Sequence, residues 1–272
     1  MASSSPNPAR IMVWSTPRSV STAFARSMSA RGDTEVFWEP YLACYSFGPD
    51  REIHWGDDMP NMLNDKYTYS YIKELLNADY PGAKVLFVKG MVEGIRGHFD
   101  VVDRGYKHSF LIRHPKKSFR SLARIENDLN LNPDFNLSTF KDIYHDLEKF
   151  YQFVQTEFGQ SAPPIIDADD LVTKPEKILP KYCEAMGIEY TPKMLDWESV
   201  SADQLNWHCT DVGDIANPTL KDSIVLSNAL KGKGFGKAPD PTKESSSPAI
   251  VEECAEHALP AYERLYAMRI QP

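Results

Sequence analysis

Short, continuous apolar runs alternate along the chain with segments in which apolar residues recur at helical spacing. An apolar run with no polar residue at every second position is typical of a parallel strand covered on both faces. Helical spacing predicts helices around 20–28, 119–129 and 143–154, and a last one over 249–268, which we expect Pro260 to interrupt with a kink. This alternation predicts an α/β fold, a three-layer sandwich with a central parallel sheet. The predicted strands are 11–14, 36–38, 85–88, 110–112 and 165–166.

The chain of 272 residues is long enough to bury one sizeable core. We predict a single domain over residues 10–272. Residues 1–9 are rich in Ser and Pro, and we expect a disordered N-terminal tail there. Glycines, then prolines and serines, crowd residues 231–247, where we expect a flexible loop within the domain.

Charged and polar residues come directly after each predicted strand. Arg18 lies just after the first strand, Glu39 after the second, Lys89 after the third, Arg113 after the fourth and Asp167 after the fifth. In an open parallel sheet, ligands bind beyond the carboxyl ends of the strands. Three cations at this edge predict a pocket for an anion.

Composition limits the ligands that this pocket could serve. Asp and Glu outnumber Lys and Arg by 38 to 30, a formal net charge of −8, which argues against a broad basic surface for nucleic acid. A local basic pocket stays compatible with that total. No apolar run is long enough to span a membrane, and the N-terminus lacks the apolar segment of a secretory signal. The four cysteines form no CxxC pair, so we expect a cytoplasmic protein without a metal site or disulfides.

The first strand and helix are joined by Ser-Thr-Pro-Arg-Ser-Val-Ser-Thr, residues 15–22. Free N–H groups at a helix start bind phosphate or sulfate. Ser19, Ser21 and Thr22 add hydroxyl donors, and Arg18 adds a fixed charge. The alternative is that the serines only cap the helix. The pattern GxxxxGK[ST] of nucleotide-triphosphate loops is absent.

This junction resembles the 5′-phosphosulfate loop of sulfotransferases that use 3′-phosphoadenosine 5′-phosphosulfate (PAPS), whose common form is Pro-Arg-Ser-Gly-Ser-Thr. Val20 stands where that family usually has glycine. Because a positive φ is costly for valine, we expect Val20 to keep a helical or extended backbone.

The fourth strand, together with Arg113-His114-Pro115 and the helix after it, resembles the 3′-phosphate signature of the same family. In that signature a strand-end Arg and a Ser eight residues later, here Arg113 and Ser121, hold the 3′-phosphate. The Gly-rich stretch at Lys231 and Gly232 weakly resembles the segment with which cytosolic sulfotransferases close over that phosphate. A mobile surface loop is the alternative there.

The resemblance covers most of residues 10–190 and implies a P-loop NTPase-like sulfotransferase fold. It implies sulfuryl transfer from PAPS to a hydroxyl or amine of a small-molecule acceptor, with adenosine 3′,5′-bisphosphate (PAP) as product and no metal. Arg18 is then the cation for the leaving group. The loop residues Ser19, Val20, Ser21 and Thr22 hold the 5′-phosphate.

The acceptor side is less well defined by the sequence. Glu39, in Val-Phe-Trp-Glu-Pro-Tyr, is the candidate general base, since several carbohydrate-type sulfotransferases have a similar Phe-Glu-Pro. The alternative is a structural carboxylate that pairs with Arg18 or caps a helix. His54, His98 and His108 are rival bases. Lys89, Glu39 and Tyr41 are candidate contacts to the acceptor. Lys89 faces either the acceptor or the sulfate in this interpretation, and a structural ion pair is the alternative for it.

Two other functions remain open from the sequence. One is a nucleotide-dependent kinase on a related sheet, which the missing triphosphate loop disfavours. The other is a non-catalytic protein that binds adenosine bisphosphate. The acceptor and the oligomeric state are not readable from the sequence.

Overall fold

The computed structural model describes residues 7–53, 63–129, 137–211, 224–236 and 247–272. All five predicted strands are present and form one sheet, in which every neighbouring pair is parallel. The order along the sheet is β2-β3-β1-β4-β5, so the first strand lies at its centre. The strands are β1 (Ala9–Ser15), β2 (Thr34–Trp38), β3 (Val85–Met91), β4 (Lys107–Ile112) and β5 (Ile165–Asp167).

The strand register brings the candidate residues to one edge. Ser15, at the carboxyl end of β1, pairs with Met91 of β3 on one side and with Leu111 of β4 on the other. Trp38, which ends β2, pairs with Lys89. The residues after β1, β2, β3 and β4 therefore emerge at the same carboxyl rim, as the sequence predicted.

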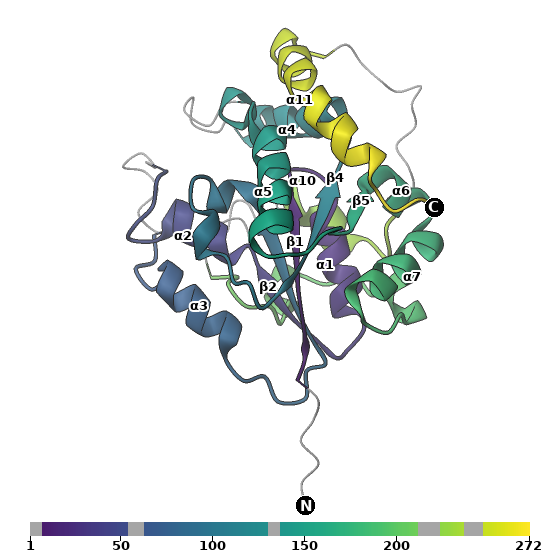
Figure 1. The fold of residues 1–272 in the computed structure, drawn as a ribbon. Helices are drawn as coiled ribbons and strands as arrows, with labels where there is room; N and C mark the ends of the chain where they lie inside the picture. The colour runs from purple at the N-terminus through teal and green to yellow at the C-terminus, as the bar shows by residue number, and fades with distance from the viewer. Residues whose placement is uncertain (1–6, 54–62, 130–136, 212–223, 237–246) are drawn as a thin grey trace, which may run out of the picture.

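Helices cover both faces of the sheet (Figure 1). The predicted helices over 20–28, 119–129, 143–154 and 249–268 are all present, and the last runs through Pro260 without a break. The α-helices are α1 (Ser21–Ser29), α2 (Pro40–Phe47), α3 (Tyr69–Asn77), α4 (Pro115–Leu129), α5 (Ile143–Glu157), α6 (Ala168–Thr173), α7 (Pro175–Met186), α10 (Ile224–Lys231) and α11 (Ala249–Ala267). Short 3-10 helices are η2 (Val92–Ile95), η3 (Phe99–Val101), η4 (Leu137–Phe140), η5 (Pro192–Leu195) and η6 (Ala202–Gln204).

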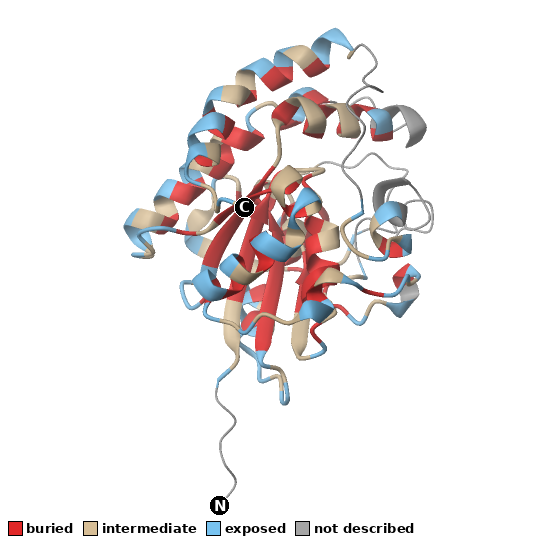
Figure 2. Cartoon of the chain, turned by 90° about the vertical axis from the view of Figure 1, so that its right-hand side faces the viewer, coloured by how far each residue is buried: buried red, intermediate tan, exposed pale blue. Residues whose placement is uncertain are grey.

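Two hydrophobic cores lie on opposite faces of the sheet, whose strands are buried between the helical layers (Figure 2). Alternate residues of one strand supply the two cores: Trp14 belongs to one, with α2, α4, α5 and α11, and Val13 to the other, with α1 and α7. This two-sided burial explains why the strands read as continuous apolar runs. It confirms the predicted three-layer α/β sandwich.

A late segment lies against the edge of the sheet beside the rim. The Trp38 amide donates to the His208 carbonyl at 2.9 Å, and the His208 amide donates to the Val36 carbonyl at 2.9 Å. The His208 ring stacks on Phe37 with ring centroids 4.6 Å apart. Residues around 208 therefore run beside β2 toward Glu39, a neighbour that the sequence did not predict.

The predicted flexible segments fall partly outside the described residues. Residues 1–6 of the predicted tail and residues 237–246 of the predicted loop lie outside them. At the boundaries the structure corrects the prediction, because Ala9 already belongs to β1 and Lys231 is the last residue of α10. Within the described ranges, no helix combines the length and apolar character needed to cross a lipid bilayer.

Candidate functional site

The junction between β1 and α1 is a tight loop held by side-chain hydrogen bonds to its own backbone. The Ser19 hydroxyl donates to the Thr16 carbonyl at 2.8 Å, and the Ser118 hydroxyl of α4 donates to the Pro17 carbonyl. Thr16 and Ser19 are fully buried. These contacts fix the path of the loop from two sides.

The backbone of this loop contradicts the expectation for Val20. Val20 has φ 60° and ψ 20°, and Arg18 also has φ 60°, so both lie in the left-handed region that disfavours side chains. Such residues cost on the order of 1–3 kcal/mol and gather at functional sites. Left-handed residues inside a turn are also an ingredient of the concave N–H arrangements that bind anions. The loop accepts the strain because its hydrogen bonds impose the turn.

The start of α1 keeps its donors available. Among the residues that the structure describes, no side chain caps this helix, and the first backbone bond runs from the Phe24 amide to the Val20 carbonyl at 3.1 Å. The amides of Ser21 and Thr22 at the helix start are thus available to an anion. The interpretation in which the serines only cap the helix finds no support in this geometry.

The second junction, between β4 and α4, lies directly against the first. Arg113 comes after β4, and its Nη1 donates to the Arg18 carbonyl at 2.8 Å. Arg18 in turn donates from Nε to the Ser121 hydroxyl of α4 at 3.1 Å. The two motifs, far apart in the chain, thus form one continuous cationic site.

One donor in this site remains unused. The Arg113 Nε is buried and has no hydrogen-bond partner in the described part of the chain. Buried polar groups are normally satisfied, so an unused guanidinium donor beside a second arginine fits a phosphate or sulfate group. The residues present therefore suit a ligand with anionic groups at both junctions.

Glu39 and Lys89 meet on the other side of β1. The Lys89 ammonium forms an ion pair with the Glu39 carboxylate and lies 4.4 Å from the centroid of the Trp38 ring. Lys89 is 2% exposed. Glu39 has φ 45°, and its amide donates to the Lys89 carbonyl at 2.7 Å. A strained backbone and a backbone hydrogen bond therefore hold this carboxylate at the rim.

Glu93 is a rim residue that sequence reasoning missed. It lies in η2, directly after β3, where the Gly94 backbone packs so closely on Tyr41 and Leu42 that a Cβ at Gly94 would clash with them. Burial raises the pKa of Glu93 to about 7 against the opposing effect of nearby Arg96. No described side chain forms a hydrogen bond or ion pair with it. The only sequence signal was a lone acid two residues past a strand.

The predicted rival residues lie elsewhere. His108 is buried in the core, where its Nδ1 accepts from Trp14 Nε1 at 3.0 Å, and burial lowers its pKa to about 4. His98 pairs with Glu52 at 2.6 Å, and His54 lies outside the described residues. None of the described contacts joins His98 or His108 to the arginines.

Tyr41 requires a correction. Its ring is 2% exposed and packs on Trp14 with centroids 5.6 Å apart, and its hydroxyl accepts from the Asp103 amide at 3.4 Å. A ring enclosed in this way offers no surface to an acceptor, so its role is packing.

The described contacts of Lys231 and Gly232 do not include Arg113. Lys231 is exposed at the end of α10, which packs on α1, and the Gly232 amide donates to the Asn228 carbonyl at 3.1 Å. No contact among the described residues joins either one to Ser121. Their role at the 3′-phosphate stays a prediction.

Comparison with known families agrees with this geometry. The model of the family described as "Sulfotransferase domain" matches residues 9–210, which include both junctions, Glu39 and Lys89. Within the described ranges, no group of three or more His, Cys, Asp or Glu side chains is arranged to hold a metal ion.

Solved structures with this fold include a sulfotransferase domain from the curacin biosynthetic pathway, with a TM-score of 0.50 and 14% identity, covering 98% of this chain and 100% of that one. The sulfotransferase domain of the Synechococcus PCC 7002 olefin synthase gives 0.53 and 17%, covering 100% and 98%. A sulfotransferase from Alicyclobacillus acidocaldarius gives 0.53 and 14%, covering 97% of each chain. At these identities the likeness concerns the fold.

Curated relatives are two proteins of Arabidopsis thaliana named branched-chain-amino-acid aminotransferase-like protein 2 and protein 1. They are 30% identical over 196 residues and 28% identical over 195 residues. The matches cover 70% and 71% of this chain and 32% of each relative. The chain thus spans about a third of their length, and their names do not describe its activity.

Proposed function

This chain belongs to the sulfotransferase domain family, and on that premise we propose that it transfers a sulfuryl group from PAPS to a hydroxyl or amine of a small-molecule acceptor, releasing PAP. The observation that carries the proposal is the direct contact between the two junctions. Arg113 donates to the Arg18 carbonyl and Arg18 donates to Ser121. A nucleotide with phosphates at both its 5′ and 3′ positions is the ligand that uses both junctions together.

The nucleotide side of the site is assigned by donor type. The helix-start amides and the hydroxyls of Ser21 and Thr22 hold the 5′-phosphate, in a turn formed at Val20 and braced by the bond from the Ser19 hydroxyl to the Thr16 carbonyl. Arg113, whose buried Nε has no described partner, and Ser121 hold the 3′-phosphate. Arginine suits this place because its fixed fork of donors matches phosphate oxygens. Lys231 and Gly232 remain candidates to contact the same phosphate.

Transfer needs little covalent chemistry from the protein. The acceptor oxygen or nitrogen forms a bond to sulfur while the bond from sulfur to the bridging phosphate oxygen breaks. Glu39 takes the proton of the acceptor, and Arg18 stabilises the negative charge that the departing phosphate gains. Positioning and charge stabilisation supply the rate enhancement, by analogy with phosphoryl transfer.

Lys89 links the base to the transferred group. In the structure its ammonium is engaged by Glu39. A sulfuryl oxygen beside Lys89 competes for that ammonium, and Glu39 is then released to accept a proton. We therefore assign Lys89 to the acceptor side, as a contact of the sulfuryl group.

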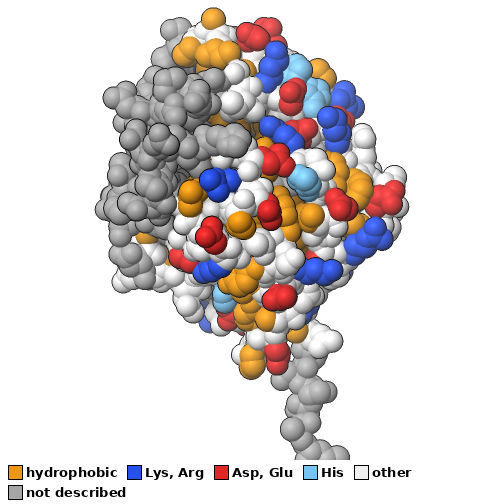
Figure 3. All heavy atoms as spheres, turned by 90° about the vertical axis from the view of Figure 1, so that its left-hand side faces the viewer, with side chains coloured by type: hydrophobic (Ala, Val, Ile, Leu, Met, Phe, Trp, Pro, Cys, Tyr) orange, Lys and Arg blue, Asp and Glu red, His pale blue; other side chains and the backbone are white. Residues whose placement is uncertain are grey.

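The distribution of surface charge and the state of the cysteines bear on the class of acceptor and on the cell compartment. On the face shown in Figure 3, Lys and Arg side chains are interspersed with Asp and Glu side chains rather than gathered into one basic surface, which favours a small-molecule acceptor over nucleic acid. Cys44, Cys183, Cys209 and Cys254 are buried and form no disulfide with one another. Cysteines kept as thiols favour a reducing compartment, and we propose the cytoplasm.

The proposal is tested by turnover of labelled PAPS with a panel of small hydroxyl and amine acceptors. We expect sulfated product and an equal amount of PAP, without added metal. PAP binding without any turnover would indicate the non-catalytic alternative. Phosphate transfer from ATP with magnesium would indicate the kinase alternative and overturn the assignment.

A further inference from the structure

Tyr144 of α5 contacts the elements that build both anion-binding junctions. Its side chain is fully buried, and its hydroxyl donates to the Arg113 carbonyl at 2.6 Å. Burial raises the pKa of Tyr144 to about 12, although the nearby Ser118 and Thr16 hydroxyls and the Arg113 guanidinium oppose that rise. The phenol is therefore a neutral donor at physiological pH.

The contacts around Tyr144 lead to the first junction as well as the second. Ser118, whose hydroxyl lies near Tyr144, donates to the Pro17 carbonyl of the β1–α1 loop. Arg113, whose carbonyl Tyr144 holds, donates to the Arg18 carbonyl of the same loop. One buried hydroxyl thus lies where the two junctions meet.

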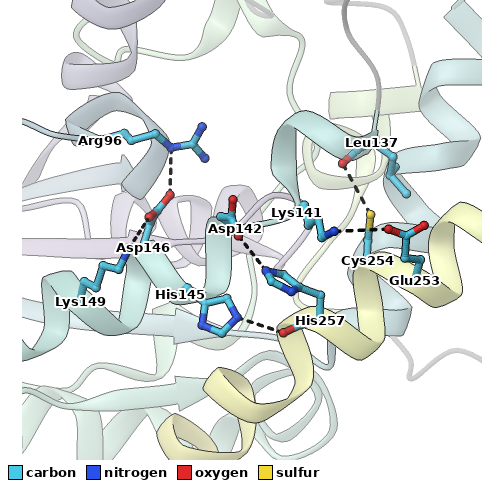
Figure 4. A network of polar contacts seen from close by, with 10 residues as sticks. All are labelled: Arg96, Leu137, Lys141, Asp142, His145, Asp146, Lys149, Glu253, Cys254 and His257. Atoms are coloured by element: carbon cyan, nitrogen blue, oxygen red, sulfur yellow. Dashed lines mark hydrogen bonds and ion pairs between the residues drawn. The ribbon is translucent and has the colours of Figure 1, made fainter.

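Polar contacts with α11 and with Arg96 hold the turn of α5 that contains Tyr144 (Figure 4). His257 of α11 donates to the Asp142 carboxylate at 2.7 Å, and His145 donates to the His257 carbonyl at 3.0 Å. Arg96 donates to Asp146 at 2.9 Å. These contacts lie on both sides of Tyr144 in sequence, so they hold its backbone at both ends of the turn.

A second buried tyrosine packs against the ring of Tyr144. Tyr262 of α11 packs beside Tyr144, with ring centroids 6.4 Å apart, and beside His114, at 5.4 Å. Its hydroxyl donates to Asp167 at 3.1 Å, and Asp167 pairs with Ile112 at the end of β4. Helix α11 therefore supports the residues on both sides of Arg113, although it lies beyond residues 9–210 that the family model matches.

We propose that Tyr144 is a positioning residue of the nucleotide site, which fixes the Arg113 junction against the Arg18 loop and is itself held in place by α11. The inference rests on the proposed function, because it assigns the 3′-phosphate to Arg113. It goes beyond that function in making recognition of this phosphate depend on a phenol that contacts no ligand and on a helix outside the matched region.

The physical reason is the carbonyl of Arg113. Without the Tyr144 hydroxyl this buried acceptor loses its donor, and leaving it unsatisfied is unfavourable. The junction then shifts toward another donor, and the Arg113 guanidinium moves with it. A group that contacts only the 5′ end of the nucleotide is affected less, because the helix-start amides of α1 do not depend on this bond.

The test compares two nucleotides on matched variants. Tyr144→Phe removes the hydroxyl and keeps the ring. Tyr182→Phe is the control, since Tyr182 is equally buried and its hydroxyl lies 3.0 Å from that of Ser109, within the other core. Calorimetry measures the affinity of each protein for PAP and for adenosine 5′-monophosphate, and the ratio of the two affinities is the readout.

We expect the preference for PAP to fall about tenfold in Tyr144→Phe, the loss of one buried hydrogen bond, and to stay unchanged in Tyr182→Phe. His257→Ala, at a partly exposed position, should lower the preference by a smaller factor by loosening the turn. If the preference for PAP is unchanged in both Tyr144→Phe and His257→Ala, Tyr144 only stabilises the fold. The same conclusion follows if Tyr144→Phe weakens the binding of PAP and of adenosine 5′-monophosphate equally and also lowers Tm. A wild-type protein with no preference for PAP would instead overturn the proposed function, and this inference with it.

Discussion

The two halves of the carboxyl rim are built in different ways. Around β1 and β4, direct hydrogen bonds join two strand-to-helix junctions, and the buried Nε of Arg113 has no partner among the described residues. Around β2 and β3, the charged groups are the Glu39–Lys89 pair and Glu93. In the first half, the hydrogen bonds between the two junctions already place the binding residues before any ligand is bound. In the second half a reactant has to compete with an existing ion pair, which suits groups that act during the reaction.

The largest expected effect is on turnover and concerns the β2–β3 half. Glu39→Gln should lower turnover of PAPS about a thousandfold, because the amide cannot accept a proton, and should leave PAP affinity within about twofold. Steady-state kinetics and calorimetry measure the two effects. Glu35→Gln is the control, since Glu35 lies in β2, the strand that leads to Glu39, and pairs with His208. If turnover survives in Glu39→Gln, the base lies elsewhere and the contrast between the halves is wrong.

Arg113→Ala tests the β1–β4 half. Loss of charge-assisted hydrogen bonds to the 3′-phosphate should weaken PAP binding about a hundredfold, whereas binding of adenosine 5′-monophosphate should change by less than about threefold. Lys116→Ala is a suitable control, because Lys116 lies only three residues after Arg113, at the start of α4, and pairs with Glu252. Equal losses for the two nucleotides would refute the role of Arg113.

The next effect is smaller and is a gain: a substitution in the strained β1–α1 loop should raise thermal stability. Val20→Gly relieves a left-handed β-branched residue, so we expect Tm to rise by about 3 °C while PAP affinity is kept. Ala23→Gly, three residues later inside α1, should lower Tm because glycine destabilises a helix interior. A fall of Tm in Val20→Gly would mean that valine contributes more through packing than it costs in backbone strain.

The smallest effect depends on pH and concerns Glu93. The folded chain keeps the Glu93 proton up to about pH 7, since burial raises this pKa from its ordinary value of 4.5. The folded state therefore binds more protons between these values, and stability falls as pH rises through them. Glu93→Gln should raise Tm by about 2 °C at pH 8 and leave it unchanged at pH 4.5. If Glu93→Gln changes Tm by the same amount at pH 8 and at pH 4.5, the Glu93 carboxylate is well solvated in the folded chain.

The sheet and the nucleotide side were predictable because their signals are local. Continuous apolar runs marked the five strands, and each rim cation follows one of these runs within four residues. That Arg18 and Arg113 lie together could be expected from the rule that parallel strands end at one edge.

Other features depend on contacts between distant segments. The φ of Val20 is imposed by hydrogen bonds from Ser19 and Ser118, which outweigh the preference of valine. Tyr144 occupies the start of a helix whose pattern is that of ordinary core, so its bond to Arg113 left no mark on the sequence. Tyr41 was misplaced because aromatic residues next to a site and in a core look alike.

The most direct test of the central claim is a titration of the wild-type protein with three nucleotides. Calorimetry would compare PAP, adenosine 5′-monophosphate, and ATP with magnesium. A site that grips both ends of a doubly phosphorylated adenosine should bind PAP without metal about a hundredfold more tightly than the monophosphate, with one nucleotide per chain. Equal affinities for these two, or a preference for ATP with magnesium, would contradict the account.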